Sequence, residues 1–203
     1  DMRKSSVLVQ GIGYKGMKYP CSSNCKQLKE YTLWLGVLSR CHHVYYNKHP
    51  TYTECTVSEA FKSYEYFYEW CNRQVGFGNI DESGKSWCLD KDILVKGNKV
   101  YSEDTCVFIP QRVNKLLTKR DSCRGEYPVG VFYHKRERKF RAQCSDGTGL
   151  QKQIGSYDTP QEAFTAYKEF KENFIKKIAC ENKLILDSRV YDALINYKVT
   201  END

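Results

Sequence analysis

The chain has 203 residues, of which 40% are hydrophobic and 28% are charged, and this balance is typical of a globular protein rather than a disordered one. Its length allows one large domain or two small ones. No apolar run approaches the roughly 18 residues that a membrane span needs. No apolar segment follows the basic N-terminus, so we expect an intracellular protein with no membrane contact and no secretory signal.

The first third of the chain is predicted to be mainly helical. Residues 1–25 show little periodicity and predict an irregular arm, whereas apolar spacing predicts a helix over residues 26–41. Residues 42–53 are polar and aromatic and predict a loop. A second helix is expected from an N-cap at Ser58 to residue 72. We assign its aromatic stripe to core packing: Phe61, Tyr64, Phe67, Tyr68 and Trp70.

The middle of the chain is predicted to run strand, loop, strand, helix. The strands are expected over residues 86–93 and 105–109, with a turn at residues 96–99 between them. Pro110 suits the first turn of a helix that ends near residue 117.

The last third of the chain predicts a small antiparallel sheet and one long helix. Strands are expected over residues 129–134, 139–144 and 151–157, joined by short turns. Residues 159–162 have the pattern of a capping box with proline at the first helical position. The helix behind this box carries one apolar face: Ala163, Ala166, Tyr167, Phe170, Phe174 and Ile178.

These elements predict an α+β protein in two parts. The N-terminal domain is expected over residues 1–118, followed by a linker over residues 119–126. A three-stranded antiparallel sheet packed on one helix is expected over residues 127–180, and a short helix and tail over residues 181–203.

The positive charge of the chain is concentrated. Residues 110–141 contain ten Lys or Arg and three acids, an excess of seven that equals the net charge of +7 for the whole chain. Neutralisation of nucleic-acid phosphates requires such a concentrated basic segment, although a solvated surface could also carry it.

The predicted sheet has one face that the helix does not cover. Strand alternation places Lys139, Arg141 and Gln143 on that face, while Phe140 and Ala142 point to the core. Lys, Arg and Gln side chains bind phosphates and base edges, and a narrow sheet fits the DNA major groove. Arg136 and Arg138 lie in the preceding turn and suit phosphate contacts.

The last third also resembles the ethylene-response-factor (APETALA-type) DNA-binding domain over about fifty residues. The shared motifs are Gly130-Val131 and residues 139–142, 154–159, 162–163 and 166–167, in that order. In that family the outer sheet face enters the major groove of double-stranded DNA. The resemblance implies base contacts at Phe132, His134, Gln143, Gln151 and Gln153, with Ser156 and Tyr167 near the DNA backbone. Several of these positions hold Arg or Trp in the family, so its target sequence does not transfer.

The middle segment resembles the core of HNH endonucleases, and the whole arrangement resembles the HNH or homing-endonuclease-like proteins of bacteriophages. The resemblance implies catalytic positions at Asp90, Lys91, Asp92 and Asn98, with Asp90 and Asp92 holding Mg²⁺ or Mn²⁺. The sequence departs from the family pattern, because Lys91 replaces the general-base histidine and Thr105 replaces an asparagine. A lysine is a poor base at neutral pH unless it is desolvated.

Two functional hypotheses therefore stay open. In the first, the chain is a sequence-specific DNA endonuclease or its degenerate descendant. In the second, it is a non-catalytic DNA-binding regulator or an inhibitor of a host DNA-processing system, with a host protein as a further partner. A zinc ion bound by Cys21, Cys25, Cys41 and Cys55 is less favoured, because their spacing does not contain two short Cys-x₂-Cys motifs. We favour reduced, buried thiols for the ten cysteines.

Overall fold

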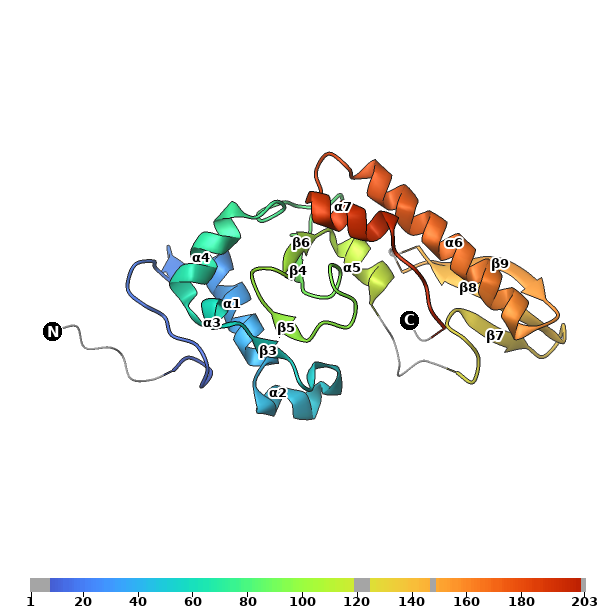
Figure 1. The fold of residues 1–203 in the computed structure, drawn as a ribbon, viewed down its shortest axis with the longest axis horizontal. Helices are drawn as coiled ribbons and strands as arrows, with labels where there is room; N and C mark the ends of the chain where they lie inside the picture. Colours follow the sequence, from blue (N-terminus) through green and yellow to red (C-terminus); the bar gives the residue numbers. More distant parts are fainter. Residues whose placement is uncertain (1–7, 119–124, 147–148, 202–203) are drawn as a thin grey trace. The chain divides into compact units, whose positions relative to one another are not determined.

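A computed structural model of the chain describes residues 8–118, 125–146 and 149–201. The described residues form a mixed α+β fold that divides into two compact units (Figure 1). The first unit contains the chain up to Asn79 together with Leu89–Phe108, and the second contains Ile80–Cys88 and the chain from Ile109 onward. Most of the expected linker, residues 119–124, lies outside the described residues.

The first unit is built on helices α1 (Lys29–Arg40) and α4 (Tyr64–Arg73), which pack against each other through aromatic side chains. The indole nitrogen of Trp34 donates a hydrogen bond of 2.8 Å to the carbonyl oxygen of Phe61. The prediction that the aromatic stripe forms core is confirmed for four of its members, which are buried: Phe61, Tyr64, Phe67 and Trp70.

Two predictions for this unit are wrong in detail. The single helix expected after Ser58 is interrupted at Ser63, which gives α3 (Glu59–Lys62) and α4, each with a serine N-cap. The loop expected over residues 42–53 contains α2 (His43–Lys48) and a 3₁₀ turn at Pro50–Tyr52. The His42 side chain accepts a hydrogen bond from the Val44 N–H and so caps α2.

Short strands complete the first part of the chain. β1 (Ser22–Ser23) pairs with β2 (Lys26–Gln27), and β3 (Thr56–Val57) pairs in parallel with β5 (Val100–Tyr101). β4 (Cys88–Asp90) and β6 (Val107–Ile109) form another two-stranded sheet, and α5 (Gln111–Leu117) follows. The predicted order of strand, loop, strand and helix is present in part: the two strands are shorter than expected, and the predicted loop contains β5.

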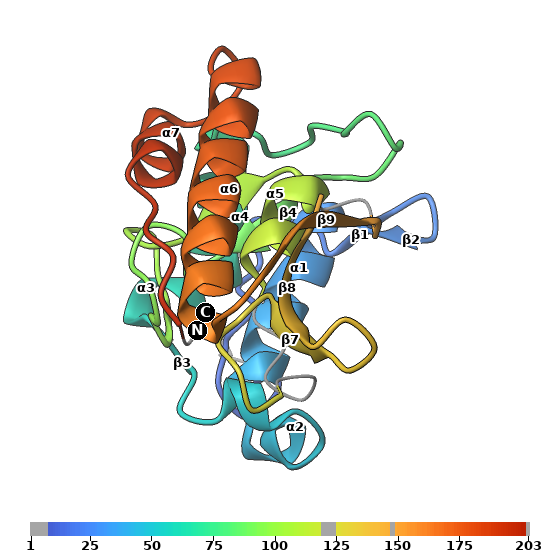
Figure 2. The same ribbon diagram turned by 90° about the vertical axis from the view of Figure 1, so that its right-hand side faces the viewer.

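The second unit contains the expected three-stranded antiparallel sheet, in the order β7 (Val131–His134), β8 (Lys139–Ser145) and β9 (Gln151–Tyr157). Helix α6 (Pro160–Glu181) lies along one face of this sheet (Figure 2). Its N-terminus has the predicted capping box, in which Thr159 and Glu162 exchange hydrogen bonds. The buried centre of the packing consists of Ala142, Cys144, Ala163, Tyr167 and Val199.

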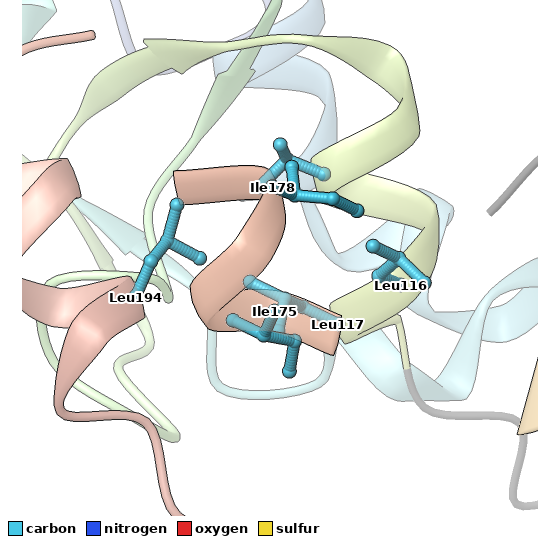
Figure 3. A pocket seen from close by; sticks show the side chains of 6 residues that line it. Leu116, Leu117, Ile175, Ile178 and Leu194 are labelled. Carbon is cyan, nitrogen blue, oxygen red and sulfur yellow. The ribbon is translucent and has the colours of Figure 1, made fainter. Parts of the chain in front are cut away.

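Apolar side chains join α5, α6 and α7 (Ser188–Ile195) within this unit. Figure 3 shows them converging from the three helices. The side chains that line this small pocket are Val113, Leu116, Leu117, Ile175, Ile178 and Leu194. Because all of them are aliphatic, we interpret the pocket as core packing and not as a ligand site.

After α7 the chain returns to the β7–β9 sheet and α6, which together we call the sheet-and-helix module. Val199 is buried in the module core, and its N–H donates a hydrogen bond of 3.0 Å to the carboxylate of Glu172 on α6. The C-terminal tail is thus a structural part of the module. Within the described ranges, no helix is long and apolar enough to cross a membrane.

Candidate nucleic-acid interface

The sheet face opposite α6 collects the polar residues expected on it. The strand register aligns Phe132, Arg141 and Ser156 in one row across the three strands, and it pairs His134 with Lys139. A bulge after Ala142 keeps Gln143 opposite Gln153 and Ser145 opposite Gln151. The structure therefore brings eight predicted residues onto one face: Phe132, His134, Lys139, Arg141, Gln143, Gln151, Gln153 and Ser156.

The turn between β7 and β8 is strongly basic. It consists of residues 135–138, with the sequence Lys-Arg-Glu-Arg, and all four are exposed. Arg138 adopts a left-handed backbone conformation with a φ of 52°, which lets the four-residue turn close the hairpin. Arg136 and Arg138 therefore lie beside the outer face, at the end of the sheet where the turn joins β7 to β8.

Glu137 is the one acid of this turn, and its carboxylate folds onto the outer face. It accepts two hydrogen bonds from Arg141, one from Nε at 3.1 Å and one from Nη2. The Ser156 hydroxyl donates to the same carboxylate at 3.5 Å, and His134 Nδ1 lies 3.7 Å from it. The Arg141 hydrogen bond holds the pKa of Glu137 below its ordinary value.

Glu137 is not among the site residues predicted from the sequence. Its charge is opposite to that of Arg141, which follows four residues later in β8, and this spacing is the only sequence feature that could have indicated the pair. At the same end of the face, Lys139 forms an ion pair with the exposed Asp158.

Tyr167 has a different role from the one that the family resemblance implies. It is 4% exposed and packs between α6 and the sheet, where its ring lies against Gly130. A phenol in this position supports the fold and is not available to a DNA backbone.

The four candidate catalytic residues lie together in the β4–β5 region, but their polar atoms bind the loop itself. The Asp90 carboxylate accepts hydrogen bonds of 2.8 Å from the N–H groups of Asp92 and Ile93. The buried Lys91 ammonium donates to Asp92 at 2.6 Å and to the carbonyl oxygen of Asn98 at 2.7 Å. The Asn98 amide group donates to the carbonyl oxygens of Lys91 and Val100, both at 2.8 Å.

Burial raises the pKa of Asp90 despite its two backbone hydrogen bonds. Asp90 and Asp92 are the residues that could hold a divalent ion. In the part of the chain that the structure describes, no group of three or more His, Cys, Asp or Glu side chains is arranged to bind a metal.

The cysteines are thiols wherever the structure describes them. Cys55, Cys71, Cys106 and Cys144 are buried, whereas Cys25 and Cys180 are exposed. Burial raises the pKa of Cys41 and of Cys106 to about 12. Such thiols are poor nucleophiles at neutral pH.

A second concave region runs along α6 on its β9 side. Its walls combine aromatic and charged side chains, with the Lys152 ammonium 5.0 Å from the centre of the Phe170 ring. None of the eight outer-face residues lines this groove, but three residues of the shared motifs do: Ile154, Tyr157 and Ala166.

Comparisons of this chain with protein-family models, with curated proteins and with solved structures found no match. The assignment of a function therefore rests on the chemistry and geometry of the chain itself.

Proposed function

We propose that this protein binds double-stranded DNA in a sequence-dependent manner through the outer face of the β7–β9 sheet. The observation that carries this proposal is the register of the sheet. It aligns one guanidinium, one ammonium and three carboxamide side chains on the face opposite α6: Lys139, Arg141, Gln143, Gln151 and Gln153. These groups can hydrogen-bond to base edges and phosphates.

The dimensions and charge of this face support the proposal. The major groove is about 12 Å wide and admits a two-stranded β-ribbon, so two neighbouring strands of this sheet can enter it together. The basic turn supplies Lys135, Arg136 and Arg138 next to the polar rows, where they can contact phosphates while the strands contact bases. We infer that strand residues discriminate sequences and that turn residues supply general affinity.

The test begins with selection of preferred duplexes from a random pool by the full chain. Gln143→Ala should weaken binding to the selected duplex by about 1–3 kcal/mol and binding to random duplexes very little. Arg136→Ala should weaken both about equally and lower the salt slope by about one. Lys48→Ala, which removes an exposed cation on α2, is the matched control for charge.

Two results contradict the proposal. One is a failure to enrich any sequence over random duplexes. The other is an equal loss of affinity in Arg136→Ala and Lys48→Ala with no loss in Gln143→Ala, because it would mean that only net charge matters.

Between the two hypotheses for the middle segment, we propose the non-catalytic one, a DNA-binding regulator with a degenerate HNH-like segment. The supporting observation is the hydrogen bonding of Asp90, Lys91 and Asn98, whose polar atoms stabilise the loop. Both backbone N–H groups donate to the same carboxylate oxygen of Asp90, Oδ1, so the loop already holds this oxygen.

Plasmid nicking tests this choice. The full chain, incubated with supercoiled plasmid and Mg²⁺ or Mn²⁺, should leave the plasmid intact at concentrations that saturate DNA binding. Nicking that disappears in Asp90→Ala, with DNA affinity retained, would establish the endonuclease hypothesis instead.

A further inference from the structure

The Glu137–Arg141 pair determines which donors of the arginine remain for a ligand. A guanidinium has five N–H donors in one plane. Glu137 engages the edge formed by Nε and Nη2. The second edge, formed by Nη1 and the remaining hydrogen of Nη2, points away from this carboxylate by the geometry of the group. Arg141 therefore keeps one complete two-donor fork.

Such a fork matches guanine more closely than any other base. In the major groove guanine presents two adjacent acceptors, O6 and N7, whereas adenine presents an acceptor beside a donor. Arg141 lies in the central strand of the sheet, in register with Phe132 and Ser156. Its side chain is 21% exposed, so it is already held against the face and retains little freedom.

We propose that Glu137 is a positioning residue that fixes Arg141 to recognise guanine in the major groove. This inference rests on the proposed function and adds the base class and the residue that sets it. Three groups surround the carboxylate: Arg141 with two hydrogen bonds, Ser156 with one, and His134 at 3.7 Å. An arginine held by this network loses less conformational entropy on binding than a free one.

Glu137 also opposes non-specific binding. A carboxylate in the middle of a basic surface repels phosphates, and it neutralises the charge of Arg141. Arg141 then contributes to binding only where a guanine accepts its two remaining donors. Removal of this charge should increase the affinity for random DNA while it decreases the discrimination between bases. These opposite effects separate a positioning role from a simple contribution to charge.

The experiment compares Glu137→Gln with Asp158→Asn in the full chain. Both variants remove one carboxylate from the same end of the face, and Asp158 pairs with Lys139 instead of Arg141. Binding is measured on the selected duplex, on random duplexes, and on duplexes in which each guanine is replaced in turn by 7-deazaguanine, which lacks the N7 acceptor. Arg141→Lys identifies the guanine concerned, because lysine keeps the charge but has no fork.

For the wild type, one guanine replacement should weaken binding about fivefold to 100-fold. Glu137→Gln and Arg141→Lys should lose most of that penalty, whereas Asp158→Asn should retain it. Both carboxylate variants should bind random duplexes more tightly than the wild type. Melting temperatures of the variants are measured alongside, so that a loss of folding is recognised.

The outcomes separate the two proposals. If the wild type selects no duplex, the proposed function fails and this inference fails with it. If the wild type is selective but Glu137→Gln keeps the full guanine penalty, or if Arg141→Lys does, the positioning role is overturned and the proposed function stands.

Discussion

Lys91 and Asn98 bind each other reciprocally: the Lys91 ammonium donates to the Asn98 carbonyl oxygen, and the Asn98 amide donates to the Lys91 carbonyl oxygen. The Asn98 side chain makes two further hydrogen bonds with the backbone of Val100. These two residues therefore close the loop between β4 and β5, at the positions where the HNH resemblance implies catalysis.

Asn98→Ala should consequently act on stability. It removes three side-chain hydrogen bonds, and at a net value of about 0.5–1.5 kcal/mol each we expect a loss of about 1.5–4.5 kcal/mol in the free energy of unfolding. Denaturant titration measures this loss. Asn196→Ala, which removes a single side-chain hydrogen bond to Asp192, is the control and should cost about 1 kcal/mol or less. A stability change no larger than that of the control would mean that Asn98 is not structural.

Gly130→Ala should destabilise the sheet-and-helix module. Gly130 has a φ of +76°, and a Cβ atom there would lie 2.2 Å from the ring of Tyr167. The ring is buried in the module core and cannot move aside without leaving a cavity. We expect a loss of several kcal/mol in the free energy of unfolding, roughly as for a clash combined with a strained residue.

The control for that variant is Gly125→Ala, where a Cβ would meet nothing within 4 Å. Circular dichroism melting of both proteins makes the comparison. Equal melting temperatures would show that the module tolerates a side chain at Gly130, and they would remove the physical reason for glycine in the Gly130-Val131 motif.

The sheet and α6 could be predicted because their signals are local. Strict alternation in β8 and the capping box at Thr159 each depend on a few neighbouring residues, and β9 has the bounds that the sequence predicts. Alternation predicts the outer-face residues of β7 and β8, and Gln151 and Gln153 in β9, so most of the candidate site was predictable as well. Ser156 shares this face with Gln153 only because of the bulge between them.

The remaining features depend on contacts between distant residues. The break at Ser63 coincides with hydrogen bonds that join Tyr14 to Lys62 and Tyr64. The docking of Val199 requires the carboxylate of Glu172, and the Glu137–Arg141 pair depends on how the hairpin turn folds. None of these contacts leaves a periodic pattern in the sequence.

The thiols should differ in reactivity according to burial. Iodoacetamide at neutral pH should label Cys25 and Cys180 first, because both are exposed in the folded protein. Cys106 should react only after unfolding, since it is buried and burial raises its pKa to about 12. Peptide mapping by mass spectrometry identifies the labelled sites.

Two additives extend the thiol prediction. Dithiothreitol should leave the melting temperature unchanged, since the described cysteines are thiols. A chelator should also leave it unchanged. A large decrease with the chelator would instead support the zinc ligands considered at Cys21, Cys25, Cys41 and Cys55.

The C-terminal tail should detach at acidic pH through Glu172. Burial alone would raise the pKa of this carboxyl, but the Val199 N–H and the Lys198 ammonium bring it below the ordinary value of 4.5. A carboxyl with a lowered folded pKa stabilises the fold fully above its unfolded pKa, and this contribution is lost as the pH falls through the folded value. The hydrogen-exchange protection factor of the Val199 amide, corrected for the intrinsic rate at each pH, should therefore be constant near neutrality and decrease below about pH 4.5.

Glu172→Gln should abolish this pH dependence, whereas Glu169→Gln, on the exposed side of the same helix, should preserve it. A protection factor that stays constant down to pH 3 in the wild type would show that the carboxylate charge does not hold the tail.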